Sequence, residues 1–166
     1  MTYENLEKTV QAAKEIFHYT VLPLADDFES ALSETKLAEL KEFEEADALS
    51  YTKRVWAKFW VALTDDNQVA GFNGIYLKQG DPESLWIPFF GVREKFRRYG
   101  IGSKLMDFII EEAKKEGAHN LRLQTTTHEL EESAQAFYEK KGFKEMKDVK
   151  RVPFQGYEVF CRELKL

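Results

Sequence analysis

The residues best suited to bind a ligand form a basic, glycine-containing segment, RRYGIGS, at positions 97–103. Gly100 and Gly102 allow the backbone to turn tightly and to present successive N–H groups. A helix that begins at such a turn adds unpaired amides and the positive end of its dipole, while arginine side chains donate charge-assisted hydrogen bonds to phosphate oxygens. The segment therefore predicts a site for a diphosphate group, with a purely structural turn as the alternative.

Two common phosphate-binding motifs do not fit this segment. The dinucleotide motif G-x-G-x-x-G requires a third glycine where the chain has Leu105, and the P-loop requires a Gly-Lys pair where Gly102 precedes Ser103. Neither a Rossmann dinucleotide site nor a kinase-type nucleotide triphosphatase is supported.

The elements that would position this turn predict a mixed sheet, the α/β (α+β mixed) class. The strand at 85–92 is apolar on both faces and should lie centrally, yet Pro88 lacks a ladder donor and Gly91 permits unusual dihedral angles, so it should bulge or part from a neighbour. The expected helices span 2–15, 26–56, 102–115 and 129–141, and the expected strands span 17–24, 59–63, 69–77, 85–92, 121–126, 143–149 and 157–164.

Two stretches resemble the motifs of a known family. VREKFRRYGIG at 92–102 closely resembles the acyl-CoA-binding motif of the GNAT superfamily of N-acetyltransferases, whose core is R/Q-x-x-G-x-G/A. AQAFYEKKGF at 134–143 resembles the closing signature of the same family. Each motif alone is moderately specific, but the pair, in this order and separated by a helix and a strand, is a strong signal. The resemblance covers residues 59 to 164, and the first fifty residues match only loosely.

The resemblance implies the acyl-CoA N-acyltransferase fold, a central mixed, mostly antiparallel sheet with parted central strands and flanking helices. It implies a single domain, 1–166, with a variable helical acceptor-side region at 1–58 and a CoA-binding core at 59–164, and acetyl-CoA as co-substrate. The amides from 98 to 103 would hold the pyrophosphate, and the strand at 89–92 would pair with the pantetheine arm. The implied cofactor-binding residues are Phe90, Gly91, Val92, Arg97, Arg98, Tyr99, Gly100, Ile101, Gly102 and Ser103.

The resemblance also places Tyr138 near the thioester sulfur, with a core tyrosine as the alternative. Because a phenol (pKa ~10) is a weaker acid than a thiol (~8.5), full proton transfer to the thiolate costs roughly 2 kcal/mol. We therefore expect Tyr138 to donate a hydrogen bond to the leaving thiolate and to pass on a proton. A backbone amide near Phe90 is expected to meet the oxyanion. Glu131 stands where the family often has an asparagine that holds the cofactor's arm, and its carboxylate would repel the cofactor unless it faces solvent.

An alkylamine acceptor must lose a proton before it attacks the thioester, since its pKa lies near 10.4. His128 follows the expected strand 121–126, and its reference pKa suits a general base. Two alternatives stay open, a surface histidine and a proton exit relayed by water. No metal is expected.

Composition and charge limit the other possibilities. The 166 residues suit one domain, and 32% charged residues without a long apolar run exclude an integral membrane protein. The net charge of −5 divides into 4 Lys+Arg against 12 Asp+Glu before residue 51 and 20 against 17 after it, with five basic residues in 93–104. This balance predicts no nucleic-acid or membrane partner but one site for a polyanionic group.

The acidic first third could attract a cationic amine, or could be an ordinary solvated helix face. No leader segment is visible, and Cys161 is the single cysteine, which together predict a cytoplasmic protein.

These features together predict an N-acetyltransferase that moves an acetyl group from acetyl-CoA to a primary amine by direct attack in a ternary complex. The acceptor would be a small-molecule or peptide amine, and a homodimer is possible. Three alternatives remain: an enzyme that uses another acyl-CoA donor, a non-catalytic CoA-binding or interaction module, and a structural domain with a fortuitous glycine turn.

Overall fold

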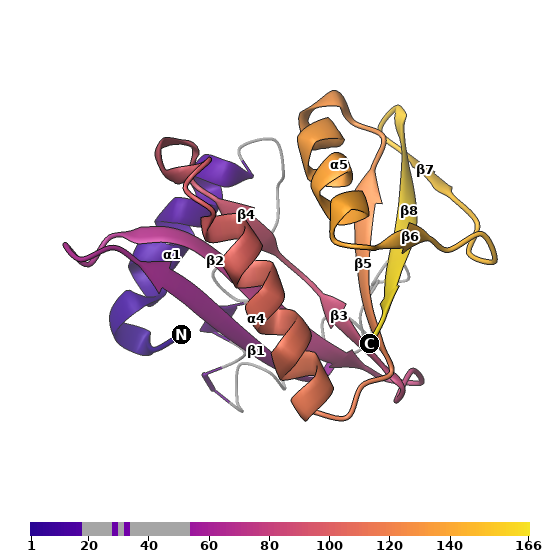
Figure 1. Cartoon of the computed structure of the whole chain (residues 1–166), viewed down its shortest axis with the longest axis horizontal. Coiled ribbons are helices and arrows are strands. Elements are labelled where there is room, and N and C mark those ends of the chain that lie inside the picture. The colour runs from indigo at the N-terminus through magenta and orange to yellow at the C-terminus, as the bar shows by residue number, and fades with distance from the viewer. Residues whose placement is uncertain (18–27, 30–31, 34–53) are drawn as a thin grey trace.

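The computed structural model describes residues 1–17, 28–29, 32–33 and 54–166, in which helices flank both faces of one sheet (Figure 1). The helices are α1 (Tyr3–Ile16), α4 (Ile101–Lys115) and α5 (Glu132–Lys140), with short 3-10 helices at Glu94–Phe96 and Glu129–Glu131. The strands are β1 (Arg54–Leu63), β2 (Val69–Lys78), β3 (Ser84–Ile87), β4 (Phe90–Val92), β5 (Asn120–Thr126), β6 (Lys144–Glu145), β7 (Val152–Phe154) and β8 (Tyr157–Lys165).

The strand order across the sheet is β1-β2-β3-β5-β8-β6, with β4 beside β2 and β7 beside β8. Among the described strands, β3 and β5 form the one parallel pair, and all other neighbours run antiparallel. The expected α/β (α+β mixed) class and the expected mostly antiparallel sheet are confirmed.

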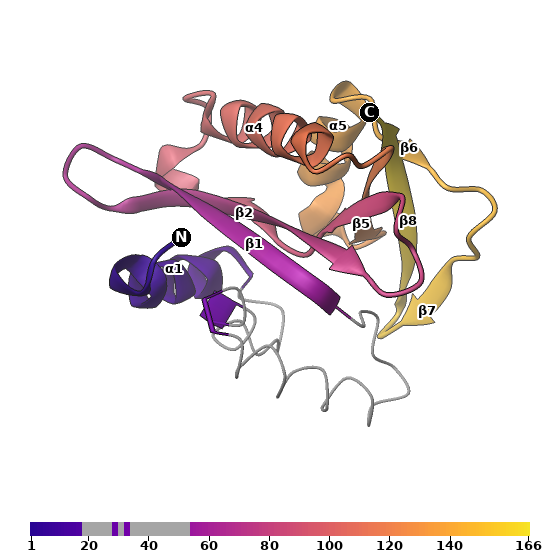
Figure 2. The same ribbon diagram turned by 90° about the horizontal axis from the view of Figure 1, so that it is seen from below.

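An aromatic core lies between the sheet and α1, which covers one face, while α4 and α5 cover the other (Figure 2). The ring of Phe28 lies 5.0 Å from that of Phe59, 5.2 Å from Phe72 and 5.8 Å from Phe89, all in edge-to-face geometry. Phe89 belongs to the link between β3 and β4, so this core anchors the chain where the predicted strand 85–92 breaks.

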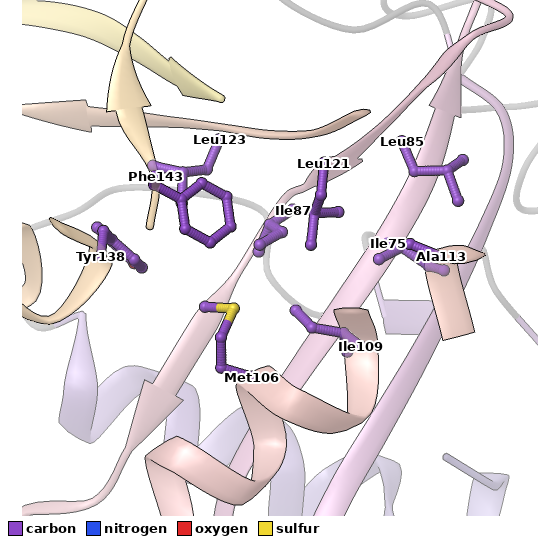
Figure 3. Close-up of a cluster of buried hydrophobic side chains, with 10 residues drawn as sticks. All are labelled: Ile75, Leu85, Ile87, Met106, Ile109, Ala113, Leu121, Leu123, Tyr138 and Phe143. Carbon is purple, nitrogen blue, oxygen red and sulfur yellow. The ribbon is translucent and has the colours of Figure 1, made fainter. Parts of the chain in front are cut away.

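A second core connects the sheet to α4 and α5 (Figure 3). Met106, Ile109 and Ala113 form the buried side of α4, as the apolar spacing of that helix predicts. The cluster contains Ile75, Leu85, Ile87, Met106, Ile109, Ala113, Leu121, Leu123, Tyr138 and Phe143. Because side chains of both helices pack on β3 and β5, this core fixes both helices to the parallel pair.

The parallel pair is braced by a charged network around Arg122 of β5. Its guanidinium lies 2.7 Å from a carboxylate oxygen of Asp81 and 2.7 Å from one of Glu163, and it packs on the ring of Trp86. Burial alone would raise the pKa of Glu163, but bonds from Lys165 and Arg122 lower that pKa below its usual value. Because Asp81 precedes β3 and Glu163 belongs to β8, Arg122 connects β5 to the chain on both of its sides.

Most element boundaries agree with the expected ones to within about one residue, and larger differences occur at β1, at the start of α5 and at β6. β1 begins at Arg54, ahead of the expected strand 59–63, so the last three residues of the expected helical segment 26–56 are strand and not helix. The expected helix 129–141 opens as a 3-10 turn before α5 begins. The expected strand 143–149 is reduced to the two residues of β6. The reason is local, because the amide of Val149 donates to the oxygen of Met146 at 3.2 Å and turns the chain away from the sheet.

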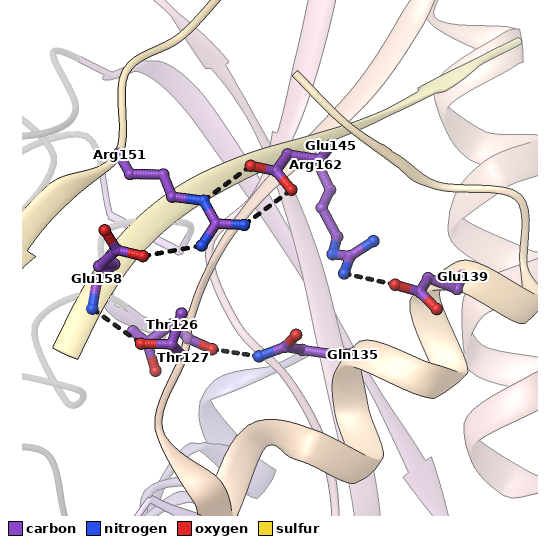
Figure 4. Close-up of polar contacts among 8 residues, drawn as sticks. All are labelled: Thr126, Thr127, Gln135, Glu139, Glu145, Arg151, Glu158 and Arg162. Carbon is purple, nitrogen blue, oxygen red and sulfur yellow. Dashed lines mark hydrogen bonds and ion pairs between the residues drawn. The ribbon is translucent and has the colours of Figure 1, made fainter. Parts of the chain in front are cut away.

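β7 is a strand that the sequence did not indicate, since its VPF sequence contains Pro153, which cannot donate to a ladder. It lies beside β8 and is joined to it by the Gln155-Gly156 turn, in which both residues have positive φ, 48° and 87°. Arg151 anchors the hairpin through the carboxylates of Glu145 and Glu158, each at 2.8 Å (Figure 4).

The expected strand 17–24 and nearly all of the expected helical segment 26–56 lie outside the described residues, together with most acidic side chains of the first third. None of the helices that the structure describes is long and apolar enough to cross a membrane.

Candidate functional site

The expected break in the strand 85–92 is present, and it separates β4 from β5. β3 pairs with β5 up to Ile87, which lies opposite Leu123. Pro88 interrupts the strand, and β4 then pairs with β2, with Phe90 opposite Asn73, while the last residues of β5 pair with β8. The two strands therefore diverge, with α4 on one side of the divergence and α5 on the other (Figure 1). We call this feature the β4–β5 parting.

The glycine turn opens α4 beside the β4–β5 parting. Arg98 and Gly100 both adopt positive φ, 69° and 78°, and Gly100 is the N-cap of the helix. In the described part of the chain, the amides of Ile101, Gly102 and Ser103 have no hydrogen-bond acceptor, as expected for the first turn of a helix. The turn thus presents the unpaired N–H groups that the sequence indicated.

Two members of the expected basic cluster are committed to other contacts. Arg93 forms a bidentate ion pair with Glu15 of α1, at 2.7 and 2.9 Å. Lys95 donates to the side chain of Gln68 at 2.7 Å. Both side chains hold α1 and the β1–β2 turn against this region.

The remaining basic side chains stay at the turn. Arg97 donates from Nε to the backbone oxygen of Val92 at 3.0 Å, which ties the turn to β4. The side chains of Arg98 and Lys104 have no hydrogen bond or ion pair to the residues that the structure describes, and Tyr99 is 77% exposed. These groups leave positive charge beside the unpaired amides.

An aromatic group spans the β4–β5 parting. The ring of Phe90 from β4 stacks on that of Phe137 from α5, with centroids 5.4 Å apart and an interplanar angle of 9°. Tyr138 lies beside both, 6.2 Å from Phe90 and 5.9 Å from Phe137, and is 8% exposed. Tyr138 is therefore both a member of the second core (Figure 3) and a neighbour of β4. The position of Tyr138 is therefore compatible with both expectations, a core tyrosine and a tyrosine near the thioester sulfur.

Glu131 turns toward the end of β5. One carboxylate oxygen accepts from the hydroxyl of Thr125 at 2.6 Å and from the amide of Thr126 at 2.9 Å. The side-chain amide of Gln135 donates to the backbone oxygen of Thr126 (Figure 4). The amide and oxygen of Thr126 are thus both bonded to side chains near α5. Donors from the protein bind the Glu131 carboxylate, so it does not simply face solvent.

His128 caps the 3-10 helix that precedes α5. Its Nδ1 accepts the amide of Leu130 at 3.0 Å, and its ring lies 4.2 Å from that of Tyr157. A neutral imidazole that accepts at Nδ1 carries its proton on Nε2. In this arrangement the basic lone pair of His128 is occupied by the backbone.

Two surface clefts are lined by other parts of the chain, although Ile101 at the start of α4 also lines the second. One, of about 610 Å³, lies between α1 and the β1–β2 turn and is lined by Lys8, Lys14 and Asp66 among others. The other, of about 560 Å³, lies between β1 and the first turns of α4, where Trp60 and Phe108 form an edge-to-face pair. Within the described ranges, no group of three His, Cys, Asp or Glu side chains gathers as metal ligands would.

A mixed sheet that parts beside β4, with a helix starting at a glycine turn next to the parting, is the architecture of the acyl-CoA N-acyltransferases. The chain matches the profile of the Acetyltransferase (GNAT) family over residues 23–143 and belongs to this family. A search of curated protein sequences gave no match.

Solved structures of similar fold support the same class. A structure assigned to the GNAT family from Desulfovibrio desulfuricans has a TM-score of 0.71 at 15% identity, covering 98% of this chain and 93% of that one. PaiA N-acetyltransferase from Thermoplasma acidophilum, in complex with coenzyme A, has a TM-score of 0.65 at 21% identity, covering 100% and 96%. A GNAT acetyltransferase from Staphylococcus aureus Mu50 has a TM-score of 0.64 at 19% identity, covering 99% and 96%. At these identities the likeness shows the shared fold.

Sequence reasoning missed the contacts of Phe137 with Phe90 and of Gln135 with Thr126. For Gln135 a signal was present, because Glu131, Gln135 and Tyr138 follow i, i+4, i+7 spacing. Their partners on β4 and β5 could not be named without the strand register.

Proposed function

We propose that this GNAT family member is an N-acetyltransferase that transfers the acetyl group of acetyl-CoA directly to a primary amine in a ternary complex. The observation that carries the proposal is the position of the unpaired amides at the start of α4, directly beside the β4–β5 parting. The diphosphate of an acyl-CoA molecule could then contact the start of α4 while its extended arm contacts the adjacent strand β4. The coenzyme A complex of the Thermoplasma protein, which shares the fold, supports a CoA co-substrate.

Acyl-CoA would bind through the backbone more than through side chains. The amides from Arg98 to Ser103 would hold the pyrophosphate, with positive charge from Arg97 and Arg98 at the rim. Among the described strands, none pairs with Phe90–Val92 on the side of β5, where Arg97 bonds the oxygen of Val92. This backbone would bind the pantetheine arm as an added strand. When bound, the thioester supplies the activated acetyl group.

Gly100→Val is expected to weaken acetyl-CoA binding about tenfold and to destabilise the fold by about 1–2 kcal/mol, the cost of a left-handed conformation for a side chain with a Cβ. The conformation is the expected cause, because a Cβ on Gly100 would meet no described atom within 4 Å beyond its own neighbours in the chain. Gly100→Asn is the matched control, since asparagine tolerates positive φ. Calorimetry with CoA and thermal unfolding measure both effects. Equal CoA affinity in Gly100→Val and wild type would remove the turn from the binding site.

The amine acceptor must reach the thioester in its neutral form. At pH 7.4 an alkylamine with a pKa near 10.4 is only about 0.1% neutral, so a route for its proton is needed. Because Nδ1 of His128 is bonded to Leu130, we propose that water relays this proton to solvent. A backbone amide near Phe90 would stabilise the oxyanion, and the hydroxyl of Tyr138 would donate to the departing thiolate.

His128→Ala is expected to leave the acid limb of the pH profile of kcat/KM unchanged, with at most a twofold lower rate. The physical reason is that the imidazole carries no free lone pair toward the parting in this arrangement. Steady-state rates measured between pH 6 and 9 test the expectation. Loss or displacement of the acid limb in the variant would instead establish His128 as the general base.

The function is tested by thiol release from acetyl-CoA with a panel of primary amines, from polyamines to lysine-containing peptides, alongside CoA calorimetry. Acetyl-dependent turnover supports the proposal, and mass spectrometry of the product identifies the acetylated nitrogen. Turnover with a longer acyl-CoA alone would contradict the acetyl donor. CoA binding without turnover across the panel would favour a non-catalytic module, and absence of CoA binding would leave a structural domain.

A further inference from the structure

A buried amide, Asn73 of β2, connects β4 to the start of α4. Asn73 is 0% exposed and lies opposite Phe90 in the sheet. Its Nδ2 donates to the backbone oxygen of Leu105, in the second turn of α4, at 2.6 Å. Its Oδ1 has no hydrogen-bond partner among the residues that the structure describes.

Stability alone does not account for an amide at this position. A buried polar atom without a partner lowers the free energy of unfolding, whereas an apolar side chain of similar volume would not. The oxygen of Leu105 is also placed to accept the helical amide one turn later, so α4 does not depend on Asn73 for its hydrogen bonding. The hydrogen bond instead fixes the placement of α4. Nδ2 of Asn73 reaches the oxygen of Leu105 only at one rotation of the helix about its axis and one position along that axis.

Close packing around Asn73 makes its hydrogen bond to Leu105 sensitive to the position of α4. A Cβ on Gly71, two residues earlier on β2, would lie 2.7 Å from the oxygen of Gly91 and 3.1 Å from Cδ1 of Leu105. A Cβ on Gly102 would lie 3.5 Å from Cγ2 of Val92. The start of α4 therefore sits almost directly on the backbone of β2 and β4, and a small shift of the helix would break the bond to Asn73.

We propose that Asn73 is a positioning residue that fixes the amides of Ile101, Gly102 and Ser103 relative to the backbone of Phe90–Val92. The inference rests on the proposed function, in which these two elements hold the pyrophosphate and the pantetheine arm of one acyl-CoA molecule. A ligand that contacts both elements loses affinity when they move relative to each other, because both contacts cannot be made at once.

Asn73→Leu tests the proposal by separating binding from stability. The KM for acetyl-CoA and the Kd for CoA are expected to rise about tenfold, with kcat at saturation changed less than twofold and Tm not lowered. Ile75→Val is the matched control, because Ile75 is in the same core and packs near Ala113 of α4, far along the helix from its first turn (Figure 3). It is expected to lower Tm and to leave both constants within twofold of wild type.

Each other outcome has a defined meaning. If Asn73→Leu binds CoA as wild type does, the proposal is wrong. If it does not fold, Asn73→Ser, whose hydroxyl is too short to reach Leu105, gives the same comparison, and failure of both to fold would make Asn73 a purely structural residue and overturn the proposal. Failure of the wild-type protein to bind CoA would contradict the proposed function itself, before any variant is compared.

Discussion

Tyr138→Phe is expected to lower kcat for acetyl transfer about 100-fold, with the KM for acetyl-CoA close to wild type. Proton or hydrogen-bond donation in the transition state typically accelerates a reaction by factors of 10² to 10⁴. Because a thiol has a pKa near 8.5, the thiolate of CoA is a good leaving group, and we expect the loss of rate at the lower end of this range. The ring itself stays in place, because its contacts with Phe90, Phe137 and Phe143 do not involve the hydroxyl.

Tyr76→Phe is the matched control for this variant. Tyr76 is also a buried tyrosine, 4% exposed, but it belongs to the aromatic core under α1 on the opposite face of the sheet. Its loss of a hydroxyl is expected to leave kcat within twofold. Rapid-mixing measurement of thiol release distinguishes a slower chemical step from slower product release. Wild-type kcat in Tyr138→Phe would mean that Tyr138 is a core residue without a part in the chemistry.

The parts of the site that could be predicted from sequence are those that depend on local backbone chemistry. A proline and a glycine within an apolar strand indicated the break that Pro88 now marks between β3 and β4. Gly100 followed by an apolar stripe indicated where α4 begins, and the helix starts one residue before the expected position. In both cases the signal and the structure lie within a few residues of each other.

The parts that could not be predicted depend on partners far away in the sequence. Arg93 counted as one of five positive charges at the turn, yet its carboxylate partner, Glu15, lies 78 residues earlier. The Glu131 carboxylate is expected from sequence to repel a polyanionic cofactor, but in the structure it accepts hydrogen bonds from the end of β5. Composition gives the number of charges, whereas strand register and helix placement decide which of them reach the site.

The close approach of α4 to the sheet gives the second large expected effect. Gly71→Ala is expected to weaken CoA binding by at least tenfold and to destabilise the fold by about 1–3 kcal/mol, the usual range for overpacking. The new Cβ would lie 2.7 Å from the oxygen of Gly91, a backbone atom of β4 that cannot rotate away. β4 has only three residues and, among the strands that the structure describes, pairs with β2 alone, so we expect β4 to be the element that is displaced.

Gly74→Ala separates crowding in general from crowding of the site. A Cβ there would lie even closer to its neighbours, 2.4 Å from Cδ1 of Phe59, but it would displace a side chain of the aromatic core under α1 and not β4. Both variants should therefore lose stability in thermal unfolding, while only Gly71→Ala loses CoA affinity in calorimetry carried out below both melting temperatures. Equal losses of CoA affinity would show that binding follows global stability. Unchanged affinity in Gly71→Ala would show that the backbone of β4 is not part of the CoA site, because a ligand bound along that strand could not be indifferent to its displacement.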